Sequence, residues 1–187
     1  MIDRKKTALV VIDLQKGIVG IQSEPHSSGT VVENAAKLAK EFRKNGMPVF
    51  LVRVTPSPDG KDGLQPMTDN KPPAMNRAPD WADIVPELGP EPADHVITKR
   101  QWGAFYGTEL DLQLRRRGID TIVLCGISTN IGVESTARFA FEYGYQQIFV
   151  EDASSSRSKE DHEHTFRTTF TRLGRIRTTA EIVADLK

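Results

Sequence analysis

Cysteine is nearly absent from this sequence of 187 residues, and neither sign of charge is in excess. The single Cys125 excludes a disulfide within the chain and is typical of proteins from a reducing compartment. Lysine plus arginine and aspartate plus glutamate both number 25, so the formal net charge is zero. Nucleic acids and anionic membranes both favour proteins with a basic surface. We therefore expect neither as a partner.

Long apolar runs are also missing. The apolar segment near the N-terminus ends at Asp13 after about seven residues, too few for the apolar region of a signal peptide or for a membrane span. A basic run at residues 115–117 precedes Gly118 at a predicted helix end, where cations complement the helix dipole. We interpret this run as a solvated face. Together these features predict a cytoplasmic protein with one domain over residues 1–187.

A recurring unit organises the chain: a segment with apolar residues at helical spacing, then a glycine, then a short apolar run. The runs are mostly continuous and rich in β-branched residues, as in strands that are buried on both faces of a parallel sheet. Each glycine is expected to end its helix in the left-handed conformation. The four glycines are Gly46, Gly118, Gly144 and Gly174.

Six strands are predicted, at residues 8–12, 48–52, 95–98, 121–124, 148–150 and 175–177. Because they alternate with helices, the pattern predicts an α/β fold in which a doubly wound parallel sheet lies between two helical layers. Residues 55–94 interrupt the pattern and contain nine of the eleven prolines, with a short helix expected at residues 81–88. Such a long insertion is usually functional or disordered, and we favour an ordered loop that covers a site or a partner subunit.

Polar residues at the carboxyl ends of strands are the candidates for chemistry, because ligands of open parallel sheets bind there. Asp13 follows the first apolar run, where burial would raise its pKa and suit it to acid/base catalysis; a helix cap is the alternative. Lys99 ends the third strand and could stabilise that carboxylate or a substrate oxyanion, or could lie on the surface. The aromatic residues that follow could wall an apolar pocket. They are Trp102, Phe105 and Tyr106.

Residues 125–138 have the pattern of a strand end, a small polar turn and a helix start, so free backbone N–H groups would face the ligand region. Together with two other segments, in this order and spacing, they resemble the isochorismatase-like hydrolases over essentially the whole chain. The segments are Val-Ile-Asp-Leu-Gln at 11–15, Lys99 followed by Gly-Ala-Phe at 103–105, and Gly-Ile-Ser-Thr at 126–129 leading to Val-Glu-Ser-Thr-Ala at 133–137.

The resemblance implies a six-stranded, Rossmann-like parallel sheet of order 3-2-1-4-5-6, a homo-oligomer such as a dimer or tetramer, and a triad of Asp, Lys and Cys. Asp13 and Lys99 match the first two members of that triad. A cis peptide bond between Ile127 and Ser128, which helps to shape an oxyanion hole, is implied as well. The substrate-binding residues expected in this region are Gln15, Trp102, Phe105, Tyr106, Ile127, Ser128, Asn130 and Ile131.

Gly132 stands where the amide-cleaving members of that family carry the nucleophilic cysteine, four positions before the Thr-Ala pair, so no acyl-enzyme can form there. Isochorismatases proper share this loss and cleave a vinyl ether: an acid protonates the enol carbon, and water attacks the resulting cation. They are also expected to place a glutamine near the end of the second strand, where this chain has Arg-Val-Thr at 53–55. The resemblance therefore indicates a small anionic or enol-ether substrate without naming it.

Other catalytic groups are less well supported. Cys125 lies in an apolar strand, where a cysteine is usually an inert core residue with a raised pKa. Residues 51–94 contain no histidine, and His162 and His164, two apart, would lie on different faces of a helix. His26 and His95 are isolated in sequence. We expect neither a metal site nor a cofactor.

The sequence thus predicts a metal-independent hydrolase of the isochorismatase-like type. Asp13 would be the general acid/base, Lys99 would set its ionisation, and backbone groups of residues 127–132 would orient the substrate. Two alternatives stay open: a regulatory protein that binds a small molecule after losing the thiol, and a cysteine amidase that uses Cys125.

Overall fold

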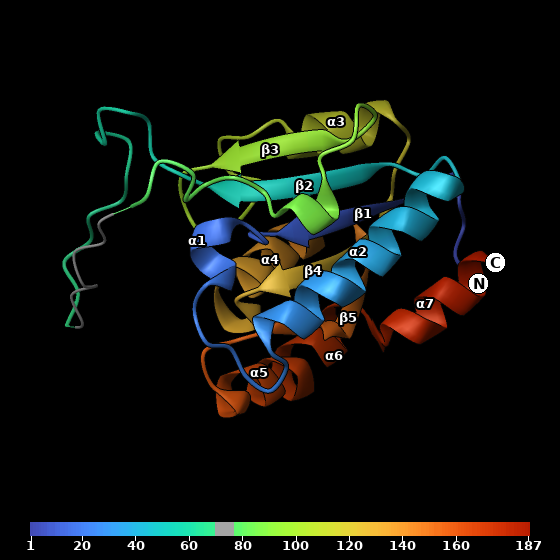
Figure 1. The fold of residues 1–187 in the computed structure, drawn as a ribbon. Helices are drawn as coiled ribbons and strands as arrows, with labels where there is room; N and C mark the ends of the chain where they lie inside the picture. Colours follow the sequence, from blue (N-terminus) through green and yellow to red (C-terminus); the bar gives the residue numbers. More distant parts are fainter. Residues whose placement is uncertain (70–76) are drawn as a thin grey trace.

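Six parallel strands form one sheet of order β3-β2-β1-β4-β5-β6 in the computed structural model, which describes residues 1–69 and 77–187 (Figure 1). The predicted strands and their order are confirmed. The strands are β1 (Thr7–Ile12), β2 (Val49–Val54), β3 (His95–Lys99), β4 (Thr121–Ile127), β5 (Gln146–Ser155) and β6 (Arg175–Arg177). Strand order reverses at β1, between its neighbours β2 and β4, which is where open parallel sheets bind ligands.

Helices cover both faces of this sheet, as predicted. Residues of α2 and α7 pack on one face, and residues of α3, α4 and η3 pack on the other. Among the described residues, no helix has both the length and the apolar character needed to cross a membrane. The α-helices are α1 (Lys16–Val19), α2 (Ser28–Lys44), α3 (Leu110–Arg116), α4 (Glu134–Glu142), α5 (Lys159–Thr165), α6 (Thr171–Leu173) and α7 (Thr179–Leu186). The described residues also form a 3-10 turn η1 (Pro86–Leu88) and two π-helical turns, η2 (Thr129–Val133) and η3 (Phe166–Phe170).

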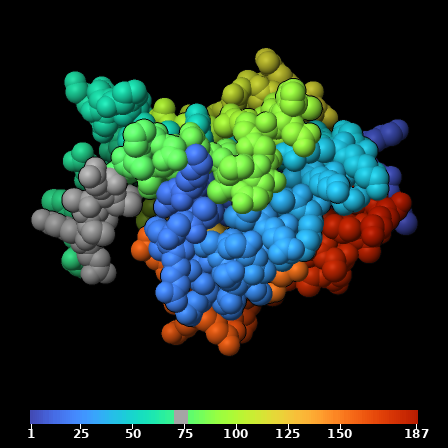
Figure 2. All heavy atoms as spheres, viewed as in Figure 1, coloured from blue at the N-terminus to red at the C-terminus, as the bar shows by residue number. Residues whose placement is uncertain are grey.

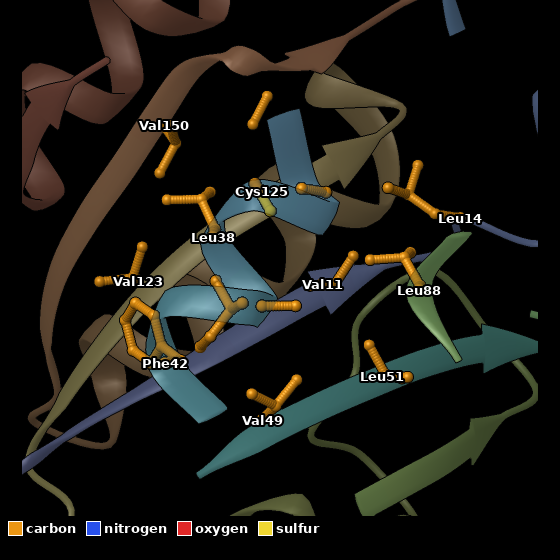
Figure 3. Close-up of a cluster of buried hydrophobic side chains, with 14 of the residues drawn as sticks. Val11, Leu14, Leu38, Phe42, Val49, Leu51, Leu88, Val123, Cys125 and Val150 are labelled. Carbon is orange, nitrogen blue, oxygen red and sulfur yellow. The ribbon is translucent and has the colours of Figure 1, made fainter. Parts of the chain in front are cut away.

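The central strand β1 shows why the apolar runs are continuous. All six of its residues are buried, with Leu9 and Val11 facing the α2 side and Val10 and Ile12 facing the α4 side. Both faces of the strand therefore need apolar side chains. Figure 3 shows the cluster on the α2 side, in which Cys125 lies among residues such as Leu38.

The glycine prediction is confirmed at three positions and wrong at the fourth. Gly46, Gly118 and Gly144 have φ values of +65°, +67° and +83°, the left-handed conformation that ends a helix. Gly174 instead has φ of −177°, which is extended backbone. A Cβ atom there would lie 2.3 Å from the backbone oxygen of Gln147, so close packing against β5 explains this glycine.

The prediction of a helix at residues 81–88 is wrong except for the turn η1. Pro86 interrupts the segment, and Val85 before it is extended, as residues before proline usually are. The backbone instead pairs with the chain that follows β1: Lys16 N–H donates to Asp83 O and Gly17 N–H to Trp81 O, both at 2.9 Å. This part of the insertion therefore packs beside α1, where Figure 2 shows green against dark blue.

The rest of the insertion is irregular over the residues that the structure describes, as expected. Its residues 70–76, which were predicted to belong to the covering loop, lie outside the described part of the chain. The basic run at residues 115–117 ends α3 with exposed side chains, which confirms the solvated face.

Candidate active site

Asp13 directly follows β1 and supplies a buried carboxylate at the point where strand order reverses. Its N–H donates to the carbonyl oxygen of Val52 at 2.9 Å, which holds it against β2. The residue is 6% exposed. Burial raises the pKa of its carboxyl group to about 6, although the nearby Lys99 ammonium opposes this shift. A carboxyl group with such a pKa can give or take a proton near neutral pH.

Lys99, the last residue of β3, reaches the same point and is 1% exposed. Its Nζ donates to Asp13 Oδ2 at 2.7 Å and to the carbonyl oxygen of Trp102 at 2.6 Å. The other carboxylate oxygen, Asp13 Oδ1, is buried without a hydrogen-bond partner among the described residues. One oxygen of Asp13 is thus held by the ammonium group, and the other is free to act on a ligand.

The turn after β4 brings Gly132 against this pair. It begins with a cis peptide bond between Ile127 and Ser128, as the resemblance implies, and continues through η2. A Cβ atom on Gly132 would lie 3.1 Å from Asp13 Oδ2 and 3.4 Å from Lys99 Nζ. Any side chain at this position would touch both charged groups, and glycine leaves that space to a ligand.

A cavity of about 500 Å³ opens over the three residues, each of which lines it. Its size suits a small metabolite. Leu64, Arg77 and Trp81 line it from the insertion, so the described part of the insertion covers a site, as expected. A Cβ atom on Gly17 would lie 2.0 Å from Trp81, which shows how closely this tryptophan packs on α1.

Four of the predicted binding residues line the cavity: Trp102, Ile127, Ser128 and Ile131. They belong to the loop after β3 and to the turn after β4. Trp102 is 65% exposed, so it lies at the rim of the cavity rather than deep inside it. Their position near Asp13 is what the binding prediction requires, although binding itself stays a prediction.

The predicted aromatic wall is wrong for the other two residues. Phe105 is buried and packs against Tyr143 and Tyr145, with ring centroids 5.5 and 5.7 Å away. Tyr106 is exposed and is not among the described residues that line the cavity. Because the loop after β3 lies against α4, Phe105 packs in the core rather than in the pocket.

The structure also places Gln15 and Asn130 away from the cavity lining. The side-chain amide of Gln15 is fully buried: its Oε1 accepts from Val54 N–H at 2.8 Å, and its Nε2 donates to Val54 O at 3.0 Å. The Asn130 Oδ1 accepts from Ser156 Oγ at 2.6 Å. Both side chains hold neighbouring segments of the chain together. A polar residue near a strand end could do this or bind a ligand, and the sequence alone does not tell which.

Three arginines line the cavity that sequence reasoning did not single out: Arg77, Arg100 and Arg157. Arg100 is paired with Asp62 at 2.6 Å, and the guanidinium of Arg77 lies 4.7 Å from the centroid of the Trp81 ring. The zero net charge conceals this local excess of cations. The sequence did contain a feature that could have identified Arg100 as a cavity residue, because it directly follows Lys99 at the end of a strand.

Cys125 lies apart from the cavity. It is fully buried in the core cluster on the α2 side, and burial raises the pKa of its thiol to about 12. A thiol in this state is a poor nucleophile. The geometry therefore favours the core interpretation of this residue.

Two histidines that lie far apart in the sequence come together in the fold. Spacing along the chain did not predict that His26 lies beside His162, yet both contact Glu151. His26 is isolated along the sequence but not in the folded chain, where it lies next to Glu151 and His162.

Comparison with known proteins agrees with the fold and the order of the motifs. A family model described as the isochorismatase domain matches residues 7–181. The chain is 58% identical over 190 residues to the isochorismatase family protein YwoC of Bacillus subtilis, covering 100% of this chain and 97% of YwoC. It is 52% identical over 185 residues to YecD of Escherichia coli O157:H7, covering 99% and 98%. The solved structure of an isochorismatase family protein from Burkholderia thailandensis matches with a TM-score of 0.95 at 47% identity, over 100% of this chain and 97% of that chain.

Proposed function

The chain belongs to the isochorismatase family, and on this basis we propose that it is a hydrolase that acts by acid/base catalysis, without a metal or a thiol nucleophile. Its substrate would be a small anionic or enol-ether metabolite. The observation that carries the proposal is the free Asp13 Oδ1, buried at the cavity with its partner oxygen held by Lys99. The absence of histidine from residues 51–94 supports catalysis without a metal.

The pKa of about 6 suits Asp13 to the first step of enol-ether hydrolysis. The protonated carboxyl would transfer its proton to the enol carbon, leaving a cation on the ether-bearing carbon. Water would then add to that cation, and the resulting hemiketal would break down to a carbonyl compound and an alcohol. The Asp13 carboxylate formed in the first step would be stabilised by the Lys99 ammonium at 2.7 Å and would regain a proton from the attacking water.

Gly132 supports this chemistry in two ways. It occupies the position at which amide-cleaving members carry their nucleophile, so covalent catalysis is unavailable there. The space where a side chain would lie is in contact with both Asp13 and Lys99, which suits it to a reacting substrate atom or a water molecule.

The charge around the cavity supports an anionic substrate. Arg77 and Arg157 line it, and neither forms a salt bridge with a carboxylate among the described residues. Such cations would hold a carboxylate or phosphate group of the substrate. Trp81 and Trp102 supply apolar surface beside them.

The first prediction is that Asp13→Asn lowers kcat/KM by at least about 100-fold on an enol-ether substrate, because the general acid is lost. A panel of small enol ethers and amides should be offered to the wild type, to this variant and to Asp120→Asn. Asp120 is an exposed residue paired with Lys6, and its variant should behave as the wild type. Because the acid must be protonated, kcat/KM should fall about tenfold per pH unit above pH about 6.

Equal rates for the wild type and Asp13→Asn would remove Asp13 from the mechanism. Amide cleavage that Cys125→Ala abolishes, in a folded protein, would instead indicate a cysteine amidase. Tight binding of a panel compound by calorimetry with no turnover would favour the regulatory binding protein.

A further inference from the structure

Three side chains from a loop, a strand and a helix meet outside the cavity described above. His26 lies in the loop before α2, Glu151 belongs to β5, and His162 belongs to α5. Glu151 Oε1 lies 2.9 Å from His26 Nε2 and 3.2 Å from His162 Nε2. One ligand atom from each residue lies within 4.8 Å of the others. None of the three is among the described residues that line the Asp13–Lys99 cavity.

These separations fit ligands of one metal ion. Zinc binds histidine nitrogen and carboxylate oxygen at about 2.0–2.2 Å, so neighbouring ligands of a tetrahedral site lie about 3.3 Å apart. The two oxygen-to-nitrogen distances, 2.9 and 3.2 Å, are already close to that value. An ion could therefore enter with small side-chain movements.

The ligand atoms are also held in place by neighbours. Thr129 Oγ1 lies 2.8 Å from His162 Nδ1, which orients the ring and leaves Nε2 directed at Glu151. Metal-bound histidines usually have such a partner on the second ring nitrogen. The carbonyl oxygen of His26 accepts from Ser23 Oγ at 2.9 Å and from Ser155 Oγ at 2.7 Å, which fixes this part of the loop.

The cluster has one buried side and one open side. The His162 side chain is 1% exposed, whereas those of His26 and Glu151 are 26% and 36% exposed. An ion can thus enter from solvent, and water can complete its coordination.

We propose that His26, Glu151 and His162 form a binding site for a divalent transition-metal ion, Zn²⁺ above all, with water as the remaining ligand. Two imidazoles and one carboxylate are ligands that zinc favours. The site is structural: it joins the loop before α2, β5 and α5, and through Thr129 it supports the turn η2 that carries Gly132. It stands apart from the acid/base mechanism and does not depend on it.

The test is metal binding by the full-length protein after treatment with a chelator. Co²⁺ should bind at one equivalent and give the visible absorption of a low-coordinate site with nitrogen and oxygen ligands, and Zn²⁺ should displace it. His26→Ala and Glu151→Gln should each weaken binding by at least about tenfold. Zn²⁺ should raise the Tm of the wild type more than that of Glu151→Gln.

His164→Ala is the matched control, because His164 is exposed on the same helix α5 and should not affect binding. Circular dichroism checks that each variant is folded, and both substituted ligands are partly exposed, which favours folding. Failure of the wild type to bind one equivalent, or equal binding by wild type and His26→Ala, would overturn the proposal. The three residues would then be a carboxylate that accepts hydrogen bonds from two histidines. Neither result bears on Asp13, whose test is turnover.

Discussion

Asp13, Lys99 and Gly132 come from three separate segments: strand ends made the first two candidates, and the family resemblance assigned all three. Asp13 and Lys99 each come at the carboxyl end of an apolar run, and parallel strands bring such ends to one edge of the sheet. Topology therefore predicts that the two residues lie near each other, and the structure adds the 2.7 Å contact between their side chains.

Gln15 and Phe105 also follow strand ends, yet their side chains turn away from the cavity. The direction of a side chain depends on the path of the loop that carries it, and local sequence does not specify that path. His26 and Glu151 were missed for a related reason, since 125 positions separate them and neither has a patterned neighbour.

At the residue scale, a thiol at position 132 should be unusually acidic. In Gly132→Cys the new Cβ would lie 3.4 Å from Lys99 Nζ, and a nearby ammonium group lowers the pKa of a thiol. We expect the pH midpoint of alkylation by iodoacetamide, followed by mass spectrometry, to fall at least about one unit below the usual 8.5. The wild type should react slowly, because Cys125 is buried.

Gly20→Cys supplies the ordinary thiol for comparison, since Gly20 is exposed. A midpoint for Gly132→Cys at or above that of Gly20→Cys would show that Lys99 does not act on this position.

At the scale of elements, the alternation of helices and strands could be predicted because β1 and its neighbours are buried on both faces and must be continuously apolar. The insertion could not be assigned in the same way. Its second half takes its structure from hydrogen bonds to the chain after β1, and those partners lie more than 60 positions away. Composition predicted irregularity there, but the helix predicted at residues 81–88 was wrong because Pro86 interrupts it, and neither feature identifies the partner.

A glycine between two elements can be required by close packing or by a left-handed backbone. Gly174 and Gly144 allow these two reasons to be tested separately. Gly174→Asn would place a Cβ atom 2.3 Å from the Gln147 backbone oxygen, so β5 or β6 must move. We expect a loss of about 2–3 kcal/mol in the free energy of unfolding. Gly144→Asn keeps a left-handed residue that asparagine tolerates, with no atom within 4 Å, and should cost about 1 kcal/mol or less.

Urea denaturation of both variants beside the wild type measures the difference. Similar losses for the two would contradict the distinction between crowding at Gly174 and conformation at Gly144.

At the scale of the whole molecule, the homo-oligomer implied by the family stays a prediction. An aromatic surface is available for it: the loop after β3 lies against α4, with Gly103 close to the Phe139 ring. Trp102, Tyr106 and Tyr143 are exposed at 65%, 69% and 45%. Exposed apolar surface of this kind often marks an interface between subunits.

We therefore expect Tyr106→Lys combined with Phe139→Lys to shift the protein toward the monomer in analytical ultracentrifugation. Leu112→Lys, which changes an exposed apolar residue of α3, is the control and should leave the mass unchanged. A wild-type protein that sediments as a monomer at all concentrations would contradict the expectation.

The buried side-chain amide of Gln15 pairs with the end of β2 as the backbone of another strand would. Its oxygen and nitrogen satisfy both backbone groups of Val54, as a peptide group of a neighbouring strand would. The polypeptide can therefore leave β2 at that point with no unpaired polar group behind it. Insertions and deletions in the loop that starts there should leave the strands undisturbed. Relatives could therefore vary the insertion that covers the cavity while Asp13 and Lys99 stay fixed at the strand ends.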